Sequence, residues 1–184
     1  SKCAEQIAEK VQTVDCIVYG DVLEHLRDPW SILKEHSRLL HEHGQVIACI
    51  PNVQNWQLLA NLLKGQWEYQ DAGLLDRTHL RFFALDSIKQ LFQQVELTIF
   101  DIVPRIFEHP QRQGVQDVLW KAAQALGVEN QQAFAVQTGA LQYVVRAAKK
   151  LQQPRLLLHS LLGETMVCSR VRIAEPHAFC LTKP

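Results

Sequence analysis

Apolar and polar positions along the chain fall into blocks that predict strands interleaved with helices. Residues 14–20, VDCIVYG, form a nearly unbroken apolar run ending at Gly20, which is typical of a strand covered on both faces of a parallel sheet. Residues 45–50, QVIACI, repeat this pattern. Two further strands are predicted at residues 95–103 and 141–148.

Apolar residues spaced three or four positions apart predict helices between these strands. One helix is expected to begin with Asp28 as its N-cap and Pro29 in its first turn, and to stop at Gly44. Asp86 is expected to cap another helix. The remaining helices are predicted at residues 2–12, 54–64, 115–126 and 130–138.

Strands that alternate with helices predict a doubly wound α/β sheet, in which ligands bind beyond the carboxyl ends of the parallel strands. Residues 20–25, GDVLEH, occupy such an end. The stretch 66–83, QWEYQDAGLLDRTHLRFF, combines aromatic, acidic and histidine residues without a clear period. We interpret it as a functional loop.

The last part of the chain differs in character from the rest. Residues 149–154, KKLQQP, are polar and end in proline, which predicts a linker, and two strands are expected on either side of Gly163. The sequence therefore divides into a domain at 1–148 and a linker with a small β-rich extension at 149–184. The extension is either an appendage or the start of a second domain, since RVRIAEP weakly resembles the entry to a further domain in multidomain bacterial proteins.

The amino-acid composition excludes some classes of protein. Nineteen basic and nineteen acidic residues give a formal net charge of zero, so no global field attracts nucleic acid. No apolar run reaches the length of about 18 residues that suggests a membrane span. The five cysteines are odd in number and lack CxxC spacing, which predicts reduced, buried thiols and a cytoplasmic location.

Three segments in order carry a resemblance to a known family. They are CIVYGDVLEHLRDPWSIL, LLHEHGQVIACIPN and DRTHLRFFALDSIKQLF. Together they resemble the fourth strand, the fifth strand and the following helix of class I S-adenosylmethionine-dependent methyltransferases, most closely the group that includes ubiquinone-type O-methyltransferases. The resemblance covers about residues 12–147. It implies a three-layer, Rossmann-like α/β sheet.

The chain also departs from this family. No GxGxG sequence is present, and only some thirteen residues precede VDCIVYG. The first three strands and the Gly-rich loop of the family are therefore expected to be absent. Because those elements make most contacts to S-adenosylmethionine, the resemblance implies that this chain alone binds the cofactor poorly or not at all.

The resemblance assigns roles to particular residues, each with a structural alternative that stays open. Gly20, Asp21, Glu24 and His25 match positions beside the cofactor, or else form a strand end and its rim. His79 is the candidate general base for a hydroxyl acceptor. The resemblance implies substrate-binding roles for four residues of the 66–83 loop. The structural alternative is an ordinary core position for Trp67 and Tyr69, and a capping and ion-pair cluster for Asp76 and Arg81. No metal site is expected, since His41 and His43 should diverge on a helix.

Two functions remain open at this point. The chain is either the acceptor side of a methyltransferase acting on a small-molecule or glycan hydroxyl, or a non-catalytic half-fold that serves as an assembly module. A GxGxG segment directly upstream in the gene would favour the enzyme. Since residues 14–20 would form an uncovered edge strand, a homodimer or an assembly that exchanges C-terminal tails is also expected.

Overall fold

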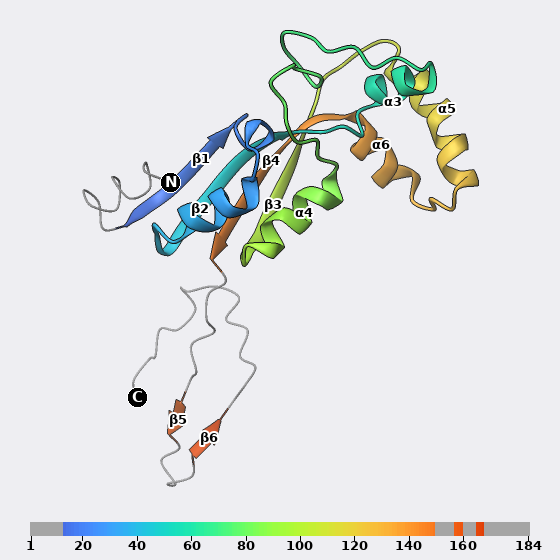
Figure 1. The fold of residues 1–184 in the computed structure, drawn as a ribbon. Coiled ribbons are helices and arrows are strands. Elements are labelled where there is room, and N and C mark those ends of the chain that lie inside the picture. Colours follow the sequence, from blue (N-terminus) through green and yellow to red (C-terminus); the bar gives the residue numbers. More distant parts are fainter. Residues whose placement is uncertain (1–12, 150–156, 160–164, 168–184) are drawn as a thin grey trace. The chain divides into compact units, whose positions relative to one another are not determined.

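The computed structural model describes residues 13–149, 157–159 and 165–167. The chain divides into two units, Ser1–Lys150 and Leu151–Pro184. The elements of the first unit are β1 (Val14–Gly20), the short 3₁₀ helix η1 (Leu23–His25), α2 (Pro29–Ser37), β2 (Leu40–Pro51), α3 (Trp56–Leu63), α4 (Leu85–Gln94), β3 (Leu97–Ile106), α5 (Arg112–Ala125), α6 (Gln131–Gly139) and β4 (Ala140–Lys149). The fold is the mixed α/β fold expected from the sequence (Figure 1).

The four strands of this unit form one sheet in the order β1-β2-β4-β3. β1 and β2 run parallel, so their carboxyl ends lie at the same edge. β4 lies between β2 and β3 and is antiparallel to both. The parallel pair is the part of the sheet that matches a doubly wound arrangement, and it is the part that carries residues 20–25.

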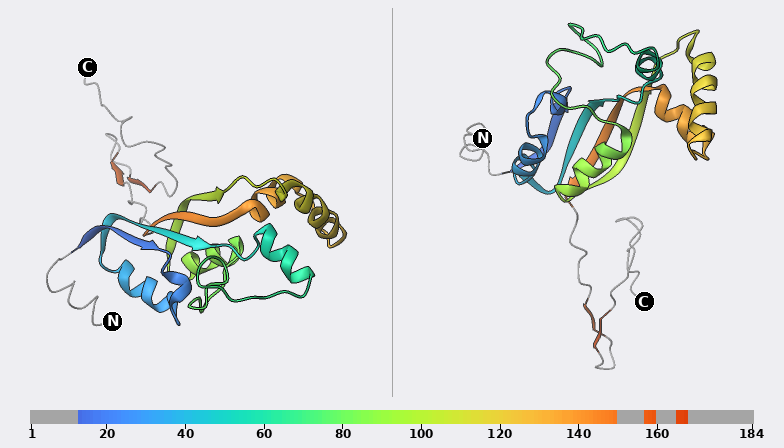
Figure 2. Two further views of the ribbon diagram at one scale, coloured as in Figure 1. Left: turned by 90° about the horizontal axis from the view of Figure 1, so that it is seen from above. Right: turned by 45° about the vertical axis from the view of Figure 1, so that its right-hand side comes forward.

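Helices α2 and α4 lie together against one face of the sheet (Figure 2). The core between them is apolar and includes Leu33, Val46, Ile50, Phe92 and Val145, each fully buried. A second, smaller cluster joins α3, α5 and α6 beyond the end of the strands. Among residues 13–149 the opposite face of the sheet has no helix, so the described residues form two of the three expected layers.

β1 lies at the edge of this sheet and differs from the strand that its sequence predicts. Among the described residues only β2 pairs with it, and Val18 is 67% exposed. Tyr19 is buried and Ile17 is half-buried against the core. The expectation of a strand covered on both faces is wrong for the described residues, because the sheet neighbour and the layer that would cover Val18 are not among them.

Two predicted helix boundaries are also wrong. α2 ends at Ser37 and β2 already begins at Leu40, so Gly44 lies inside a strand and does not end a helix. A Cβ atom at Gly44 would lie 3.0 Å from the carbonyl oxygen of Val14, so glycine serves close strand approach there. At α4 the N-cap is Ala84, whose amide donates to the Ser87 hydroxyl, and not Asp86.

Several other predictions are confirmed in outline. Residues 66–83 contain no named helix or strand, and the predicted helix at 54–64 is present as α3. The tail carries β5 (Leu157–His159) and β6 (Thr165–Val167), which pair with each other antiparallel on either side of Gly163. The predicted helix at 2–12 lies outside the described residues.

The cysteine prediction is only partly met. Cys16 and Cys49 are free thiols, but Cys16 is exposed because it lies on the uncovered face of β1. Cys3, Cys168 and Cys180 lie outside the described residues. In the part of the chain that the structure describes, no helix has the length and apolar character required to cross a membrane.

Candidate functional site

The candidate site lies where β1 and β2 end. Gly20 is the last residue of β1, and Asp21 follows with a positive φ of 52°, which turns the chain sharply away from the sheet. η1 then places Glu24 beneath the strand ends, and Asp28 caps α2 by accepting a hydrogen bond from the Ser31 amide. This abrupt turn brings an acid and a histidine to the edge of the sheet within five residues of the end of β1.

The 66–83 loop is held against η1 by backbone hydrogen bonds. The carbonyl oxygen of Glu24 accepts from the amides of Leu80 and Arg81, at 2.8 and 2.9 Å. Earlier in the loop, the amide of Arg77 donates to the carbonyl of Gln70 at 3.0 Å. These bonds fix His79 beside Glu24, although the two residues are far apart in the sequence.

Glu24 is the most unusual side chain of the site. It is 1% exposed, and neither of its carboxylate oxygens has a hydrogen-bond partner among the described residues. Its Oε1 atom lies 4.0 Å from Nε2 of His79, which is itself 9% exposed. Burial raises the pKa of the Glu24 carboxyl, and the neighbouring Asp21 charge adds to the rise, while the backbone amide of Glu24 itself and His25 partly oppose it.

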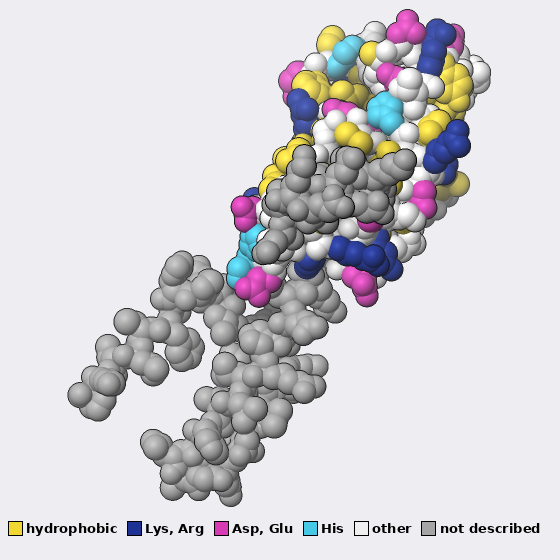
Figure 3. Space-filling view, turned by 60° about the vertical axis from the view of Figure 1, so that its left-hand side comes forward, with side chains coloured by type: hydrophobic (Ala, Val, Ile, Leu, Met, Phe, Trp, Pro, Cys, Tyr) yellow, Lys and Arg dark blue, Asp and Glu magenta, His cyan; other side chains and the backbone are white. Residues whose placement is uncertain are grey.

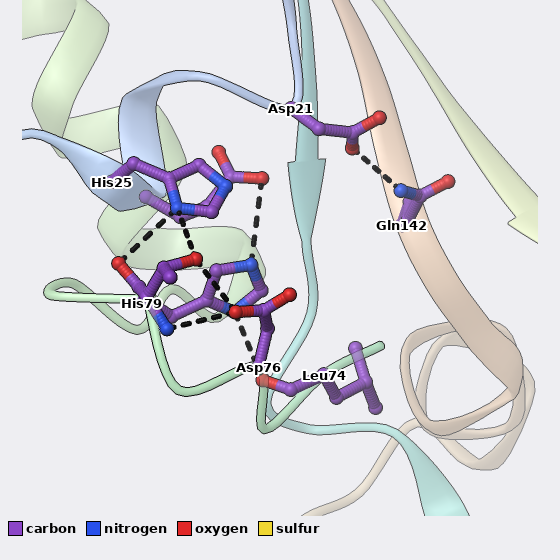
Figure 4. Close-up of polar contacts among 8 residues, drawn as sticks. Asp21, His25, Leu74, Asp76, His79 and Gln142 are labelled. Atoms are coloured by element: carbon purple, nitrogen blue, oxygen red, sulfur yellow. Dashed lines mark hydrogen bonds and ion pairs between the residues drawn. The ribbon is translucent and has the colours of Figure 1, made fainter. Parts of the chain in front are cut away.

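The two histidines of the site face each other, with ring centroids 4.7 Å apart in an edge arrangement (Figure 4). Nδ1 of His79 is 3.2 Å from the carbonyl oxygen of Leu74. Nδ1 of His25 is 3.2 Å from the carbonyl oxygen of Thr78 and 3.0 Å from its hydroxyl. A carbonyl oxygen only accepts, so both histidines donate from Nδ1 and leave Nε2 free to accept a proton or bind a metal.

Asp76 lies at the rim of the same site in a different environment. Its Oδ1 atom accepts from the hydroxyl of Thr78 at 2.6 Å and from the Thr78 amide at 2.8 Å. These hydrogen bonds hold the pKa of the half-buried Asp76 carboxyl below its usual range. Because the Thr78 hydroxyl gives its proton to Asp76, it can only accept from His25, and Asp76 thereby helps to orient the His25 ring.

These groups line one cavity of about 250 Å³. Its walls include five residues that the sequence singled out: Asp21, Glu24, His25, Asp76 and His79. The structure thus brings together residues from the end of β1 and from the 66–83 loop. It also adds Gln142 of β4, whose amide donates to Asp21 at 2.7 Å and which no sequence motif indicated.

The other predicted site residues do not line this cavity. Trp67 and Tyr69 contact each other, with ring centroids 6.3 Å apart, and Trp67 is 5.5 Å from Phe82. Phe82 in turn lies 6.4 Å from the His79 ring, so these aromatic side chains extend away from the cavity. The guanidinium of Arg81 donates to the carbonyls of Leu80 and Arg27 instead of pointing into the cavity.

The described residues offer only part of a site for S-adenosylmethionine. The Asp21 carboxylate is already engaged by Gln142, and a Cβ atom at Gly20 would meet no atom within 4 Å, so no close cradle surrounds this position. The sequence also lacks the GxGxG loop. The cavity therefore fits one wall of a cofactor site and does not complete one.

Charged side chains on the surface are mixed in sign. On the uncovered part of the face in Figure 3, Lys and Arg side chains are scattered among acidic, apolar and histidine side chains. This mixed surface agrees with the zero net charge of the sequence, and it offers no extended basic patch on that face.

Comparison with known proteins gives a family match. A family profile described as a methyltransferase domain matches residues 2–102, which is more than half of the chain. No curated protein matches the chain.

Solved structures with a similar fold are distant in sequence. A possible histamine N-methyltransferase from Thermotoga maritima is 17% identical, with a TM-score of 0.47, over 74% of this chain and 56% of its own. A SAM-dependent methyltransferase from Archaeoglobus fulgidus is 13% identical, with a TM-score of 0.45, over 79% of this chain and 65% of its own. Magnesium protoporphyrin IX methyltransferase from Synechocystis is 8% identical, with a TM-score of 0.43, over 75% and 46%. The chain spans less than two thirds of each of these proteins.

Proposed function

Because the chain belongs to the methyltransferase domain family, we propose that it forms the acceptor side of an enzyme that methylates a hydroxyl group of a small molecule or glycan. The observation that supports this proposal most strongly is the buried Glu24 beside His79 in a cavity at the ends of β1 and β2. A hydroxyl must lose its proton as it is methylated, and an imidazole with a free Nε2 beside a carboxylate suits that task.

The residues of the cavity would act on the acceptor in three ways. S-adenosylmethionine supplies a methyl group from a positively charged sulfonium, and the carboxylates of Asp21 and Glu24 favour positive charge nearby. The buried inner side of the cavity, at Glu24 and His79, would limit the access of water, and His79 would take the acceptor proton at Nε2. Glu24, 4.0 Å away, would stabilise the imidazolium that results.

The remaining roles are assigned by position. Gly20, Asp21, Glu24 and His25 would border the methyl donor, and Asp76 would hold the rim of the acceptor site through Thr78. Trp67 and Tyr69 continue from His79 through Phe82, so an apolar or sugar ring of the acceptor would lie along these aromatics. Arg81 would orient the acceptor only if its guanidinium exchanged its hydrogen bonds to the Leu80 and Arg27 carbonyls for bonds to the acceptor.

Substitution of His79 tests the proposal. In a protein that carries this chain together with a Gly-rich cofactor loop, His79→Ala should lower turnover by about 10²-fold or more at saturating acceptor. The readout is S-adenosylhomocysteine release with catechol and a phenyl glycoside as hydroxyl probes. The control is His109→Ala, whose ring contacts Trp56 outside the cavity. Unchanged turnover in His79→Ala would reject the assignment.

Cofactor binding by the chain alone is a separate test. Because only one wall of the cofactor site is present, the 184-residue chain should show no binding of S-adenosylhomocysteine at micromolar concentrations by calorimetry. A micromolar dissociation constant would overturn this expectation.

The uncovered face and edge of the sheet favour a second candidate function, an assembly module without catalysis. Val18, Phe100 and Val103 are exposed on β1 and β3, and β1 has an unpaired side among the described residues. Such a surface is suited to a homodimer or a tail-exchanged assembly. The absence of an upstream GxGxG segment in the gene would favour this function, and its presence would favour the enzyme.

We also propose a cytoplasmic location. The free thiols of Cys16 and Cys49 support it, since an exposed thiol is best kept reduced in that compartment.

A further inference from the structure

Three potential metal ligands converge in the cavity. One ligand atom from each of Glu24, His25 and His79 lies within 4.8 Å of the other two. We propose that these three residues bind a single divalent transition-metal ion of the Zn²⁺ type. A metal site here could not be expected from the sequence, because His79 lies more than fifty positions after the adjacent Glu24 and His25.

The histidine tautomers support a metal site. Metal-binding histidines usually donate their other ring nitrogen to a carbonyl or carboxylate, which fixes the ring and leaves the second nitrogen unprotonated. His79 and His25 both do this through Nδ1, to the carbonyls of Leu74 and Thr78. Both Nε2 atoms are therefore held as acceptors in the cavity that Glu24 also lines, and this arrangement favours a cation between the three groups.

The environment of Glu24 provides an independent observation. Its carboxylate is 1% exposed and has no hydrogen-bond partner among the described residues. A buried carboxylate without a partner is costly, and such groups normally pair with a charge or coordinate a metal. The nearest cationic candidate, His79 Nε2, is 4.0 Å away, which is too far for a hydrogen bond. A bound cation would satisfy Glu24 and both histidines together.

The ligand set indicates the class of metal. Two imidazoles and one carboxylate are typical of catalytic zinc sites, which keep a further position open for water or substrate. Zn–N bonds of about 2.0–2.1 Å place two ligands of a tetrahedral site about 3.3 Å apart. The three side chains would therefore have to move together by about 1 Å. The open position would face the cavity, whose walls also carry Asp21 and Asp76.

The role of the metal, but not its binding, rests on the proposed function. A metal ion would bind the acceptor oxygen and lower the pKa of its hydroxyl, so that the proton would pass to solvent water and no side-chain base would be needed. In that state His79 is a ligand and no longer the proton acceptor. Loss of turnover in His79→Ala fits both roles, so metal binding must be measured directly and without cofactor or acceptor.

The test is calorimetric titration of the 184-residue chain, freed of metal with a chelator, with ZnCl₂. We expect one Zn²⁺ per chain with a dissociation constant of about 1 µM or tighter. Glu24→Gln and His25→Gln should each weaken binding by at least about 10²-fold. Co²⁺ added to the same proteins should give a visible absorption spectrum typical of nitrogen and oxygen ligands only in the wild type.

The matched control is a double substitution, His41→Gln with His43→Gln. These two rings lie 5.9 Å apart on β2, and their removal tests whether Zn²⁺ binds to a different pair of histidines. The control should bind as the wild type does. Absence of stoichiometric binding in the wild type, undiminished binding in Glu24→Gln, or loss of binding in the control would overturn the proposal. If Glu24→Gln fails to fold by circular dichroism, His25→Gln decides. A chain that binds Zn²⁺ but supports no methyl transfer would reject the proposed function alone.

Discussion

The two sides of the cavity hold acids in opposite states. On the inner side, Glu24 is buried, lacks hydrogen-bond partners among the described residues and has a raised pKa. On the rim, Asp76 is half-buried, accepts two hydrogen bonds from Thr78 and has a lowered pKa. The first arrangement costs stability, and the second contributes to it.

This contrast separates a functional group from a positioning group. Asp76 holds Thr78, and Thr78 accepts from His25, so the rim acid acts on the site through another residue. The buried Glu24 carboxylate, in contrast, receives no hydrogen bond from any described residue. Groups that remain costly in this way are expected where a ligand completes the environment.

The largest difference between the two acids is expected in the effect of their substitution on Zn²⁺ affinity. Glu24→Ala removes a ligand and should abolish stoichiometric Zn²⁺ binding, a loss of at least about 10²-fold. Asp76→Asn only loosens the orientation of His25 and should cost about 10-fold. Calorimetry on both variants compares them directly, and an equal loss in the two would contradict the ranking.

Stability should change in the opposite sense for the same two positions. In the presence of a chelator, Glu24→Gln removes an unpaired buried charge and should raise the free energy of unfolding by about 1–3 kcal/mol. Asp76→Asn should lower it or leave it unchanged. Urea unfolding followed by circular dichroism gives both values. A Glu24→Gln protein that is clearly less stable would mean that Glu24 has a structural partner.

The same reasoning extends to the two faces of the sheet. Val46 and Val145 are fully buried on the helix-covered face, whereas Val18 is 67% exposed on the other. If a second copy covers that face, Val18→Lys should shift the chain from dimer to monomer by sedimentation equilibrium, while Glu68→Lys, on the loop, should not. A wild-type monomer of 21.1 kDa at high concentration would remove the basis for a dimer.

The smallest effect is expected at Asp28, an exposed acid whose pKa, like that of Asp76, is lowered by local hydrogen bonds. The Ser31 side chain and then the Ser31 amide, which donates to Asp28 at 3.0 Å, lower the pKa of the Asp28 carboxyl. A carboxyl with a lowered pKa stabilises the fold above its unfolded-state pKa, and this stabilisation is lost as the pH falls through the folded-state pKa. Asp28→Ala should therefore lower the melting temperature near neutral pH and have a smaller effect below about pH 4. An equal effect at both pH values would contradict the capping role.

Much of the site could be predicted from the sequence because it lies in two short segments. GDVLEH follows an apolar strand, and DRTHLRFF lacks any period, so both were recognisable as a strand end and a functional loop. The structure places Asp21, Glu24, His25, Asp76 and His79 around one cavity, as the order of the segments suggested.

Other properties depend on tertiary contacts and were not accessible from the sequence. The Leu74 carbonyl selects the His79 tautomer, and Gln142 reaches Asp21 from a strand more than a hundred residues later. The exposure of Val18 was also missed, because an apolar strand looks the same whether or not its second face is covered. The missing partners of Glu24 are visible only once its neighbours in space are known.

The tautomers of the two histidines test the account most directly. Nitrogen-15 NMR of the 184-residue chain, freed of metal, should show the Nδ1-protonated form for His25 and His79, with both Nε2 signals shifting on addition of one equivalent of Zn²⁺. The other histidines, such as His109, should keep their shifts. Nε2-protonated rings, or Nε2 signals at His25 and His79 that do not respond to Zn²⁺, would contradict the claim that Glu24 and these histidines form the functional centre.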